Sequence, residues 1–364
     1  MAFALQIDPP TGGEARPLLG LSTALRLALT AQSAGAMAIV ADEALHGALR
    51  DERLRIPVQT VRPSGAWVLR APANLVIHRG LIGAGLQARG ERDWDLLGEP
   101  FAYEVPFGFD PILVVDRGAL GRARGALLRS LRKPQDGWTS TYLNRHISLF
   151  FTRFLVATPL RPNQVSVGIL GIGVAGAWLA TRGTYLDLLA GAFLFQAQSV
   201  LDGCDGEMSR LTFRGSRLGE WLDTVGDDLT NYGYFTGASW GLYTATQNQL
   251  YLIAGAIILI CGALSSGIEY AYLIKIGSGD LLKYPLGIGK APGGAEDKGP
   301  LARAVDAISP LFKRDTFVLL TLIGAALGLL QVMIVLFALG AISILIAVFK
   351  AEVRMRSAPP PGGE

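Results

Sequence analysis

The 364-residue sequence has few of the residues that build disulfide frameworks and zinc sites. Its two cysteines, Cys204 and Cys261, lie in separate apolar stretches, so we expect small buried side chains and no disulfide. Its three histidines, His46, His78 and His146, share no spacing that is typical of metal ligands. The sequence therefore argues against a disulfide-stabilised protein and against a zinc site.

A large excess of charge of one sign is also lacking. The formal net charge is +3 and no DNA-binding motif is present, so we expect no nucleic-acid partner. Residues 1–10 lack a positive start followed by a sufficient apolar core, so we expect no signal peptide. Insertion into a membrane would then depend on the long apolar runs, which begin near Asn163.

These runs divide the chain into three predicted parts. Residues 1–133 are rich in charge and predict a cytoplasmic domain, residues 134–162 an interfacial amphipathic helix and linker, and residues 163–356 an all-α transmembrane domain. Six spans are expected, at about 163–181, 185–208, 218–244, 249–274, 315–330 and 331–349. Lys and Arg gather on the side of both chain ends, so we expect that side to be cytoplasmic and to face anionic membrane lipids.

Four aspartates stand in the second and third predicted spans, in the pattern D-x2-D-G-x2-S-R-x8-G-x3-D-x3-D. Charge at membrane depth is costly unless it faces a cavity, a partner or a metal. Helical spacing places Asp202 and Asp205 on one face, and Asp223 and Asp227 on one face of the next helix. We therefore expect two facing acidic surfaces, joined by a short polar turn at Leu211–Leu218.

Such a group of carboxylates would repel one another unless cations offset their charge. Carboxylate oxygens prefer Mg²⁺ or Mn²⁺, and two such ions can bind a diphosphate. Gly206 and Gly219 have no Cβ and allow a phosphate to approach the helix backbones, and Arg210 adds a permanent positive charge. The pattern therefore predicts a two-metal site for a phosphorylated ligand.

The acidic pattern resembles the signature of the CDP-alcohol phosphotransferases, in which Ala is usual at the position of Ser209. That family has six transmembrane helices around a cytoplasm-facing polar cavity, and the resemblance implies a homodimer. It also implies four metal ligands, Asp202, Asp205, Asp223 and Asp227. Asp227 would in addition be the general base for the acceptor hydroxyl, which attacks the β-phosphorus of a CDP-linked donor and releases CMP. The CDP pocket would be lined by Gly206, Ser209, Arg210 and Gly219.

The segment before the first span is similar to a narrower subgroup, the di-myo-inositol phosphate phosphate synthases. The matching residues are Lys133, Pro134, Asp136, Gly137, Asn144, Arg145, Ser148, Pro162 and Asn163, with Ser166 in place of Thr. This resemblance implies a phosphorylated polyol acceptor. Candidates for its phosphate are Arg145, Arg153, Lys313 and Arg314. The alternative roles are a membrane-surface anchor for the amphipathic helix and positive-inside flanking for the last two residues.

The N-terminal part alternates apolar runs with helical stretches and predicts an α/β domain. The expected strands are Ala36–Ala41, Ala73–Ile77 and Pro111–Val115, and the expected helices 22–35, 43–52 and 117–132. The domain resembles the nucleotidyltransferase half of the bifunctional inositol-phosphate cytidylyltransferases. However, the Gly-rich loop before Arg16 has lost its pattern, and Asn74 stands near the expected metal aspartate, so we expect a degenerate nucleotidyltransferase-like domain.

We consider three classes of function: a transferase, a cation transporter and an inactive scaffold. The leading hypothesis is transfer of a phosphoalcohol group from CDP-diacylglycerol or a CDP-polyol to an inositol phosphate-like acceptor, in phospholipid or phosphodiester biosynthesis. A phosphatidyltransferase with glycerol phosphate or serine as acceptor is the alternative within this class. From other classes, a membrane cation transporter would gain nothing from Arg210, and an inactive scaffold would not be expected to keep four acids.

Overall fold

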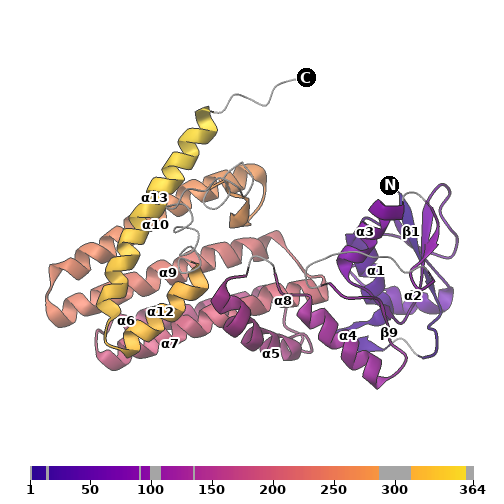
Figure 1. Cartoon of the computed structure of the whole chain (residues 1–364), viewed down its shortest axis with the longest axis horizontal. Helices are drawn as coiled ribbons and strands as arrows, with labels where there is room; N and C mark the ends of the chain where they lie inside the picture. The colour runs from indigo at the N-terminus through magenta and orange to yellow at the C-terminus, as the bar shows by residue number, and fades with distance from the viewer. Residues whose placement is uncertain are drawn as a thin grey trace, which may run out of the picture. The chain divides into compact units, whose positions relative to one another are not determined.

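The computed structural model describes residues 2–13, 16–89, 92–98, 108–133, 136–286 and 313–357. Contacts between residues divide the chain into two compact units (Figure 1). Unit 1 comprises Met1–Asp136, Thr152–Pro159 and Glu207–Arg214. Unit 2 comprises Gly137–Phe151, Leu160–Gly206 and Gly215–Glu364. Residues 287–312, between the predicted spans at 249–274 and 315–330, lie outside the described residues, as does Pro134.

Unit 1 contains a parallel five-stranded sheet in the order β5-β4-β1-β6-β8. Its strands are β1 (Phe3–Asp8), β4 (Ala38–Ala41), β5 (Val58–Gln59), β6 (Trp67–Pro72) and β8 (Trp94–Asp95). Two small antiparallel ladders pair β2 (Pro17–Leu18) with β3 (Leu21–Ser22) and β7 (Leu75–Val76) with β9 (Ile112–Leu113). The helices are α1 (Thr23–Ser33), α2 (Glu43–Leu49), α3 (Arg79–Arg89) and α4 (Arg117–Arg129).

The α/β character predicted for the N-terminal part is confirmed, and its core lies where strands and α1 meet. Leu5 of β1, Ile39 of β4 and Leu69 of β6 are almost fully buried in one cluster with Leu27 of α1. Strands buried on both faces by crossover helices are the usual form of a parallel sheet. Asn74 lies next to β7, in a ladder outside the main sheet.

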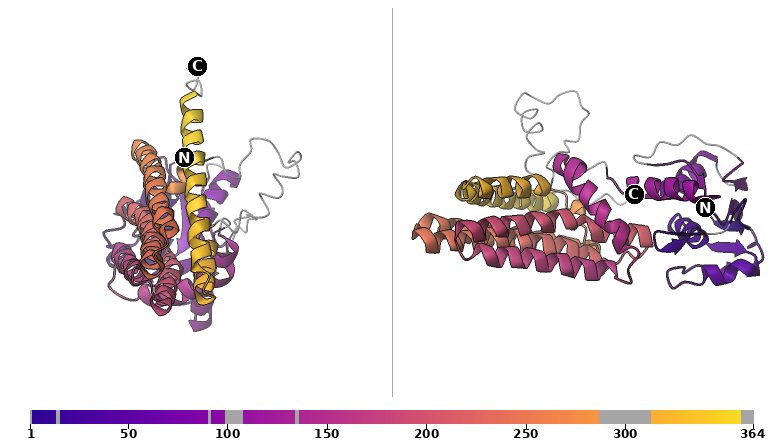
Figure 2. Two further views of the ribbon diagram at one scale, coloured as in Figure 1. Left: turned by 90° about the vertical axis from the view of Figure 1, so that its left-hand side faces the viewer. Right: turned by 90° about the horizontal axis from the view of Figure 1, so that it is seen from below.

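Unit 2 is mostly helical, and two of its helices continue into unit 1. The elements are η1 (Ser140–Asn144), α5 (Arg145–Leu155), α6 (Pro162–Ala180), α7 (Tyr185–Leu201), α8 (Gly203–Thr212), α9 (Arg217–Thr246), α10 (Gln249–Ile276), η2 (Leu281–Lys283), α12 (Arg314–Ala326) and α13 (Leu330–Ser357). Helix α6 packs along α7 and α9, and α10 packs along α9 and α13 (Figure 2). The chain passes between the units at five points, two of which lie within helices, in the middle of α5 and in the middle of α8.

Helices occupy all six positions at which spans were predicted, but they differ in their capacity to cross a bilayer. Within the described residues, three are long and apolar enough by length and composition, namely α6, α10 and α13. Helices α7 and α12 have 17 and 13 residues, and α9 carries Asp223 and Asp227 of the motif. The structure therefore supports a membrane protein, while the number of six spans stays a prediction.

The predicted second span, 185–208, is wrong as a single helix. The structure has α7 up to Leu201 and α8 from Gly203, with Asp202 between them. Glycine lowers helix stability because it gains more freedom in the unfolded chain, and α8 holds two of them near its start. The polar turn predicted at Leu211–Leu218 is shorter, since α8 continues to Thr212 and α9 starts at Arg217.

Helix α5 has the predicted amphipathic pattern, with the apolar side outward. The apolar residues predicted for this helix, Leu143, Ile147, Phe150, Phe151 and Phe154, are 36–53% exposed. The polar residues Asn144, Arg145 and Ser148 are at most 7% exposed. This inversion of the usual soluble pattern fits a helix whose apolar side meets lipid.

Two glycines have packing roles, one in each unit. On α6, a Cβ at Gly176 would lie 2.9 Å from the carbonyl oxygen of Gly191 on α7, so this glycine allows close contact of the two helices. On α3, a Cβ at Gly85 would lie 2.3 Å from the ring of Trp94. Neither glycine needs a nucleotide to explain it.

Candidate functional site

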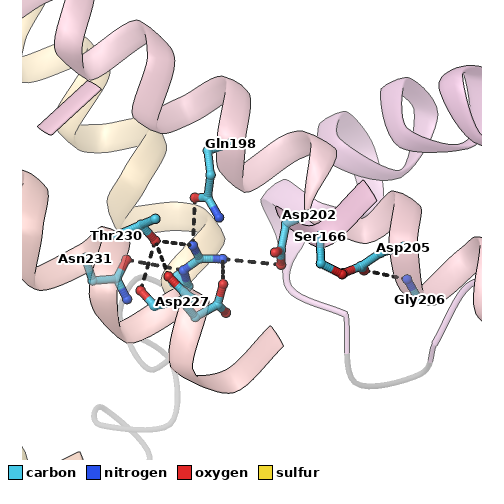
Figure 3. Close-up of polar contacts among 10 residues, drawn as sticks. Ser166, Gln198, Asp202, Asp205, Gly206, Asp227, Thr230 and Asn231 are labelled. Atoms are coloured by element: carbon cyan, nitrogen blue, oxygen red, sulfur yellow. Dashed lines mark hydrogen bonds and ion pairs between the residues drawn. The ribbon is translucent and has the colours of Figure 1, made fainter. Parts of the chain in front are cut away.

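The acidic motif brings two of its carboxylates together on one guanidinium in unit 2. Arg314, at the start of α12, places Nη1 2.8 Å from Asp227 Oδ1 and 3.5 Å from Asp202 Oδ2 (Figure 3). Its Nη2 donates to Gln198 Oε1 at 2.9 Å, and its Nε to Asn231 Oδ1 at 3.3 Å. The C-terminal end of α7, the start of α12 and the middle part of α9 thus meet at a polar cluster in which one cation offsets two acids.

Asp205 has different partners from Asp202. It is 7% exposed, and its carboxylate accepts hydrogen bonds from the hydroxyl of Ser166 on α6 and from the backbone N–H of Gly206 (Figure 3). Asp223 lies on α9 one turn before Asp227 and is exposed. The charges of Asp205, Asp223 and Asp227 all act on Asp202, so the four acids lie within electrostatic reach of one another.

The donor set fits a hard divalent cation, although the acids are not arranged around one. Among the described residues, no three Asp, Glu, His or Cys side chains form a group that could hold a metal ion. Asp227 Oδ1 is nevertheless buried and accepts no hydrogen bond from any described residue, which leaves it capacity for a cation beyond its ion pair. Carboxylate oxygens are the donors that Mg²⁺ and Mn²⁺ prefer. The residues present therefore fit Mg²⁺ or Mn²⁺ by the chemistry of their oxygen donors.

The four residues predicted for the CDP pocket lie on two helices. Gly206, Ser209 and Arg210 follow Asp205 along α8, and Gly219 lies in the first turn of α9. A Cβ at Gly219 would lie 3.0 Å from Asn163 Oδ1, so the glycine permits close approach at this helix start. Ser209 and Arg210 belong to the half of α8 that is part of unit 1.

The four basic residues predicted for an acceptor phosphate have different surroundings. Arg145 is buried, and its Nη1 lies 3.4 Å from where a Cβ at Gly203 would be, beside the start of α8. Arg314 is paired with the acids as described. Arg153 lies over the ring of Phe154, 4.6 Å from its centroid, in a segment of unit 1. Lys313 is exposed at the N-cap of α12.

Some residues of the cluster were not predicted. Gln198 stands four positions before Asp202 and Asn231 four positions after Asp227, so both lie on the helix faces of the motif. A search of the same helix faces one turn before Asp202 and one turn after Asp227 would have identified these two residues. Nothing local indicates Thr230, whose hydroxyl lies 3.5 Å from Arg314 Nη2.

Comparison with known proteins was made by sequence and by structure. No family model matches the chain. Proteins named bifunctional IPC transferase and DIPP synthase match it: the one from Thermococcus kodakarensis is 37% identical over 107 residues, 29% of this chain and 24% of that protein. The one from Archaeoglobus fulgidus is 31% identical over 140 residues, 38% of this chain and 27% of that protein. The chain is thus similar to part of each of these proteins.

The resemblance predicted from the motifs is therefore confirmed. A third relative of the same name, from Rubrobacter xylanophilus, is 37% identical over 128 residues, 34% of this chain and 28% of that protein. The matches thus span about a quarter of the length of these relatives. Among solved structures, Mycobacterium tuberculosis phosphatidylinositol phosphate synthase (PgsA1) with CDP-DAG bound aligns with a TM-score of 0.43 and 21% identity, over 60% of this chain and 98% of that one.

Proposed function

We propose that this protein catalyses the Mg²⁺- or Mn²⁺-dependent transfer of a phosphoalcohol group from a CDP-linked donor to an alcohol acceptor, with release of CMP. The observation that carries the proposal is the meeting of Asp202 and Asp227, from separate helices, at one cationic group. A site that brings carboxylates and a cationic side chain together before substrates bind is suited to phosphoryl transfer, in which the negative charge of the phosphate groups must be neutralised. The named relatives support the same class of reaction.

The chain's own residues have the following roles in this reaction. Asp227 takes the proton of the acceptor hydroxyl, whose oxygen then forms a bond to the β-phosphorus of the donor. The bond from that phosphorus to the oxygen of CMP breaks, and CMP leaves with the electron pair. Arg314 offsets the charge of Asp202 and Asp227 before substrates bind, and is placed to contact phosphate oxygens afterwards.

Divalent ions held by Asp202, Asp205, Asp223 and Asp227 would neutralise charge on the donor diphosphate. Ser209, Arg210 and the two motif glycines line the CDP pocket in this proposal. Arg145, beside the start of α8, is the basic residue best placed for an acceptor phosphate, because it is buried near the acidic helix.

The acceptor we propose is a phosphorylated polyol of the inositol phosphate type. The match of residues 133–166 to the di-myo-inositol phosphate phosphate synthases and the DIPP synthase name of the relatives both favour it. The donor is CDP-diacylglycerol or a CDP-polyol, and glycerol phosphate or serine is the alternative acceptor.

We further propose an integral, multi-pass membrane location with the site and both chain ends in the cytoplasm, and a homodimer. Three helices with the length and composition of membrane spans, and the concentration of Lys and Arg on one side, support the membrane part. The homodimer follows from the family resemblance alone.

The test is CMP release by the purified protein in lipid nanodiscs. CDP-diacylglycerol and CDP-inositol are each combined with inositol phosphate, glycerol phosphate or serine, after dialysis against EDTA and after addition of Mg²⁺ or Mn²⁺. We expect CMP only with metal and with inositol phosphate. Absence of CMP from every pair, together with Mn²⁺ flux into vesicles that contain the protein, would instead support the cation transporter.

A further inference from the structure

The second half of the motif helix α8 is held by the N-terminal α/β unit. Residues Glu207–Arg214 belong to unit 1 by their contacts, although the first residues of α8 belong to unit 2. Met208 and Leu211 are at most 2% exposed. Three separate contacts hold the C-terminal end of this helix, two from arginine side chains and one from a phenylalanine ring.

The first contact is made by Arg26 of α1, which is only 3% exposed. Its Nη1 donates to the carbonyl oxygen of Leu211 at 2.9 Å, and its Nη2 donates to those of Leu18 and Leu19 at 2.9 and 3.1 Å. The last carbonyls of a helix have no partner inside the helix. The buried guanidinium of Arg26 binds one of these carbonyls, that of Leu211, and also binds two carbonyls of the β2–β3 hairpin. It therefore connects α8 to the rest of unit 1.

The second contact is made by Arg53. Its Nη1 donates to the carbonyl oxygen of Thr212, the last residue of α8, at 2.9 Å. Asp51 fixes the guanidinium through two hydrogen bonds of 2.6 Å, from Nε and Nη2. A positive charge is favourable at a helix C-terminus, where the helix dipole is negative. Arg53 therefore has a preset orientation toward this helix end.

The third contact is the ring of Phe213, directly after α8. The backbone of Phe213 has φ of 55°, in the left-handed region, and the N–H of Arg214 donates to the carbonyl oxygen of Ser209 at 3.1 Å. Glycine is usual at this position of a helix end, and a side chain there costs roughly 1–2 kcal/mol. The ring packs against Leu25 and Leu29 of α1, which offsets that cost.

At the carboxyl edge of the sheet in unit 1, the side chain of Asn74 has a structural role. In doubly wound sheets a nucleotide binds at the carboxyl ends of the strands, where the strand order reverses. Here the buried side chain of Asn74 donates to the carbonyl oxygens of Thr11 and Val114 and accepts from the N–H of Thr11. The residue near the expected metal aspartate therefore holds the loop after β1 in place.

We propose that unit 1 acts as a clamp on α8, in which Arg26, Arg53 and Phe213 are positioning residues for the motif residues Ser209 and Arg210. Both motif residues lie in the clamped half of the helix, within one turn of the held carbonyls. The kinetic part of this inference rests on the proposed function, since these two residues are assigned there to the CDP pocket. The clamp itself rests on the contacts alone.

The first test is hydrogen exchange of the full-length protein in nanodiscs, followed by mass spectrometry. The variants are R26Q, R53Q and F213A, and the control is R62Q. Arg62 also bonds a backbone carbonyl, that of Ala66, and pairs with Asp93, but it does not contact α8. We expect amides of residues 207–214 to exchange about tenfold faster or more in each variant and to be unchanged in R62Q.

Unchanged exchange over residues 207–214 in R53Q would overturn the clamp, and so would equal acceleration in β1 and β6, because that indicates general destabilisation of unit 1. R53Q decides the matter if R26Q fails to fold, since the Arg53 side chain is partly exposed at 13%.

The second test is the dependence of CMP release on donor concentration. We expect R53Q to raise KM for the CDP-linked donor by about tenfold with kcat changed by less than about threefold, because a displaced pocket weakens donor binding. R53K, which can still donate to Thr212, should recover part of the loss. A fall in kcat with an unchanged KM would contradict the positioning role. If the wild-type protein releases no CMP, the proposed function fails, while hydrogen exchange still decides the clamp.

Discussion

At the scale of single residues, the positive charge of Arg314 lies beside two of the four proposed metal ligands. Arg314 forms ion pairs with Asp202 and Asp227 at 3.5 and 2.8 Å. It also donates a hydrogen bond to Gln198 on α7, one turn before Asp202. One guanidinium cannot neutralise four acids, so the site keeps a negative balance that favours a divalent ion. A positive side chain this close must also oppose the binding of that ion.

This opposition gives a prediction for R314Q. Removing the positive charge should raise the affinity of the protein for Mn²⁺ by about tenfold or more, because a unit charge within 4 Å contributes several kcal/mol in a partly buried site. Isothermal titration calorimetry with Mn²⁺ measures this directly. The matched control is K313Q, which removes the exposed neighbour. Equal Mn²⁺ affinity in R314Q and wild type would show that Asp202 and Asp227 are not metal ligands.

A second prediction at this scale concerns His78 and pH. Burial, and then the charge of Arg79, lower the pKa of His78, and its Nδ1 accepts a hydrogen bond from Gly80. The folded state therefore favours the neutral ring. Its stabilising contribution is complete above the unfolded pKa of about 6.5 and is lost as pH falls below it.

We expect the melting temperature of unit 1 to fall between pH 7 and pH 5, and the slope to be shallower in H78Q, as followed by circular dichroism. Identical slopes in the two proteins would rule out this role of His78.

The sequence predicted which residues share a face of one helix, but it did not predict contacts between residues far apart in the chain. The spacing of Asp223 and Asp227 predicted a common helix face, and both lie on α9. The pairing of Arg314 with Asp202 joins positions 112 residues apart, and no local pattern reports such a contact. Arg314 was assigned to an acceptor phosphate for its charge alone, and that role stays a prediction.

At the scale of elements, close contact between helices α6 and α7 depends on glycine. The Cβ of G176A would lie 2.9 Å from the carbonyl oxygen of Gly191, whereas that of G171A, on the same helix, meets nothing within 4 Å. We expect G176A to lower the free energy of unfolding by about 1–3 kcal/mol and G171A not to lower it. Thermal unfolding in detergent compares the two variants, and equal stability would contradict the packing role.

The elements themselves were predicted unevenly. Periodicity predicted the helices of unit 2 to within a few residues, except for the break at Asp202 and the end of α13, which continues to Ser357 beyond the predicted 349. In unit 1 the predicted strand regions around β7 and β9 form a small ladder, and the central strands β1 and β6 were not among the three runs singled out. Strand pairing depends on contacts far apart in sequence, which local patterns do not contain.

At the scale of the whole molecule, the motif helix is the element that links the two units. Asp205 and Gly206 lie in unit 2, and Ser209 and Arg210 in unit 1, on one continuous helix. Ser209 and Arg210, which we assign to the proposed CDP pocket, therefore depend on contacts within unit 1 for their position.

The most direct test of the account is the turnover of D227N beside D228N. Asp228 is the adjacent acid on α9 and accepts hydrogen bonds from Ser266 and Tyr270, away from Arg314. We predict that D227N lowers kcat for CMP release by about 10²–10⁴-fold while the Kd of the CDP-linked donor stays within a few-fold, because a general base is lost. D228N should keep most of its turnover. Wild-type turnover in D227N would contradict the assignment of Asp227 and, with it, the proposed site.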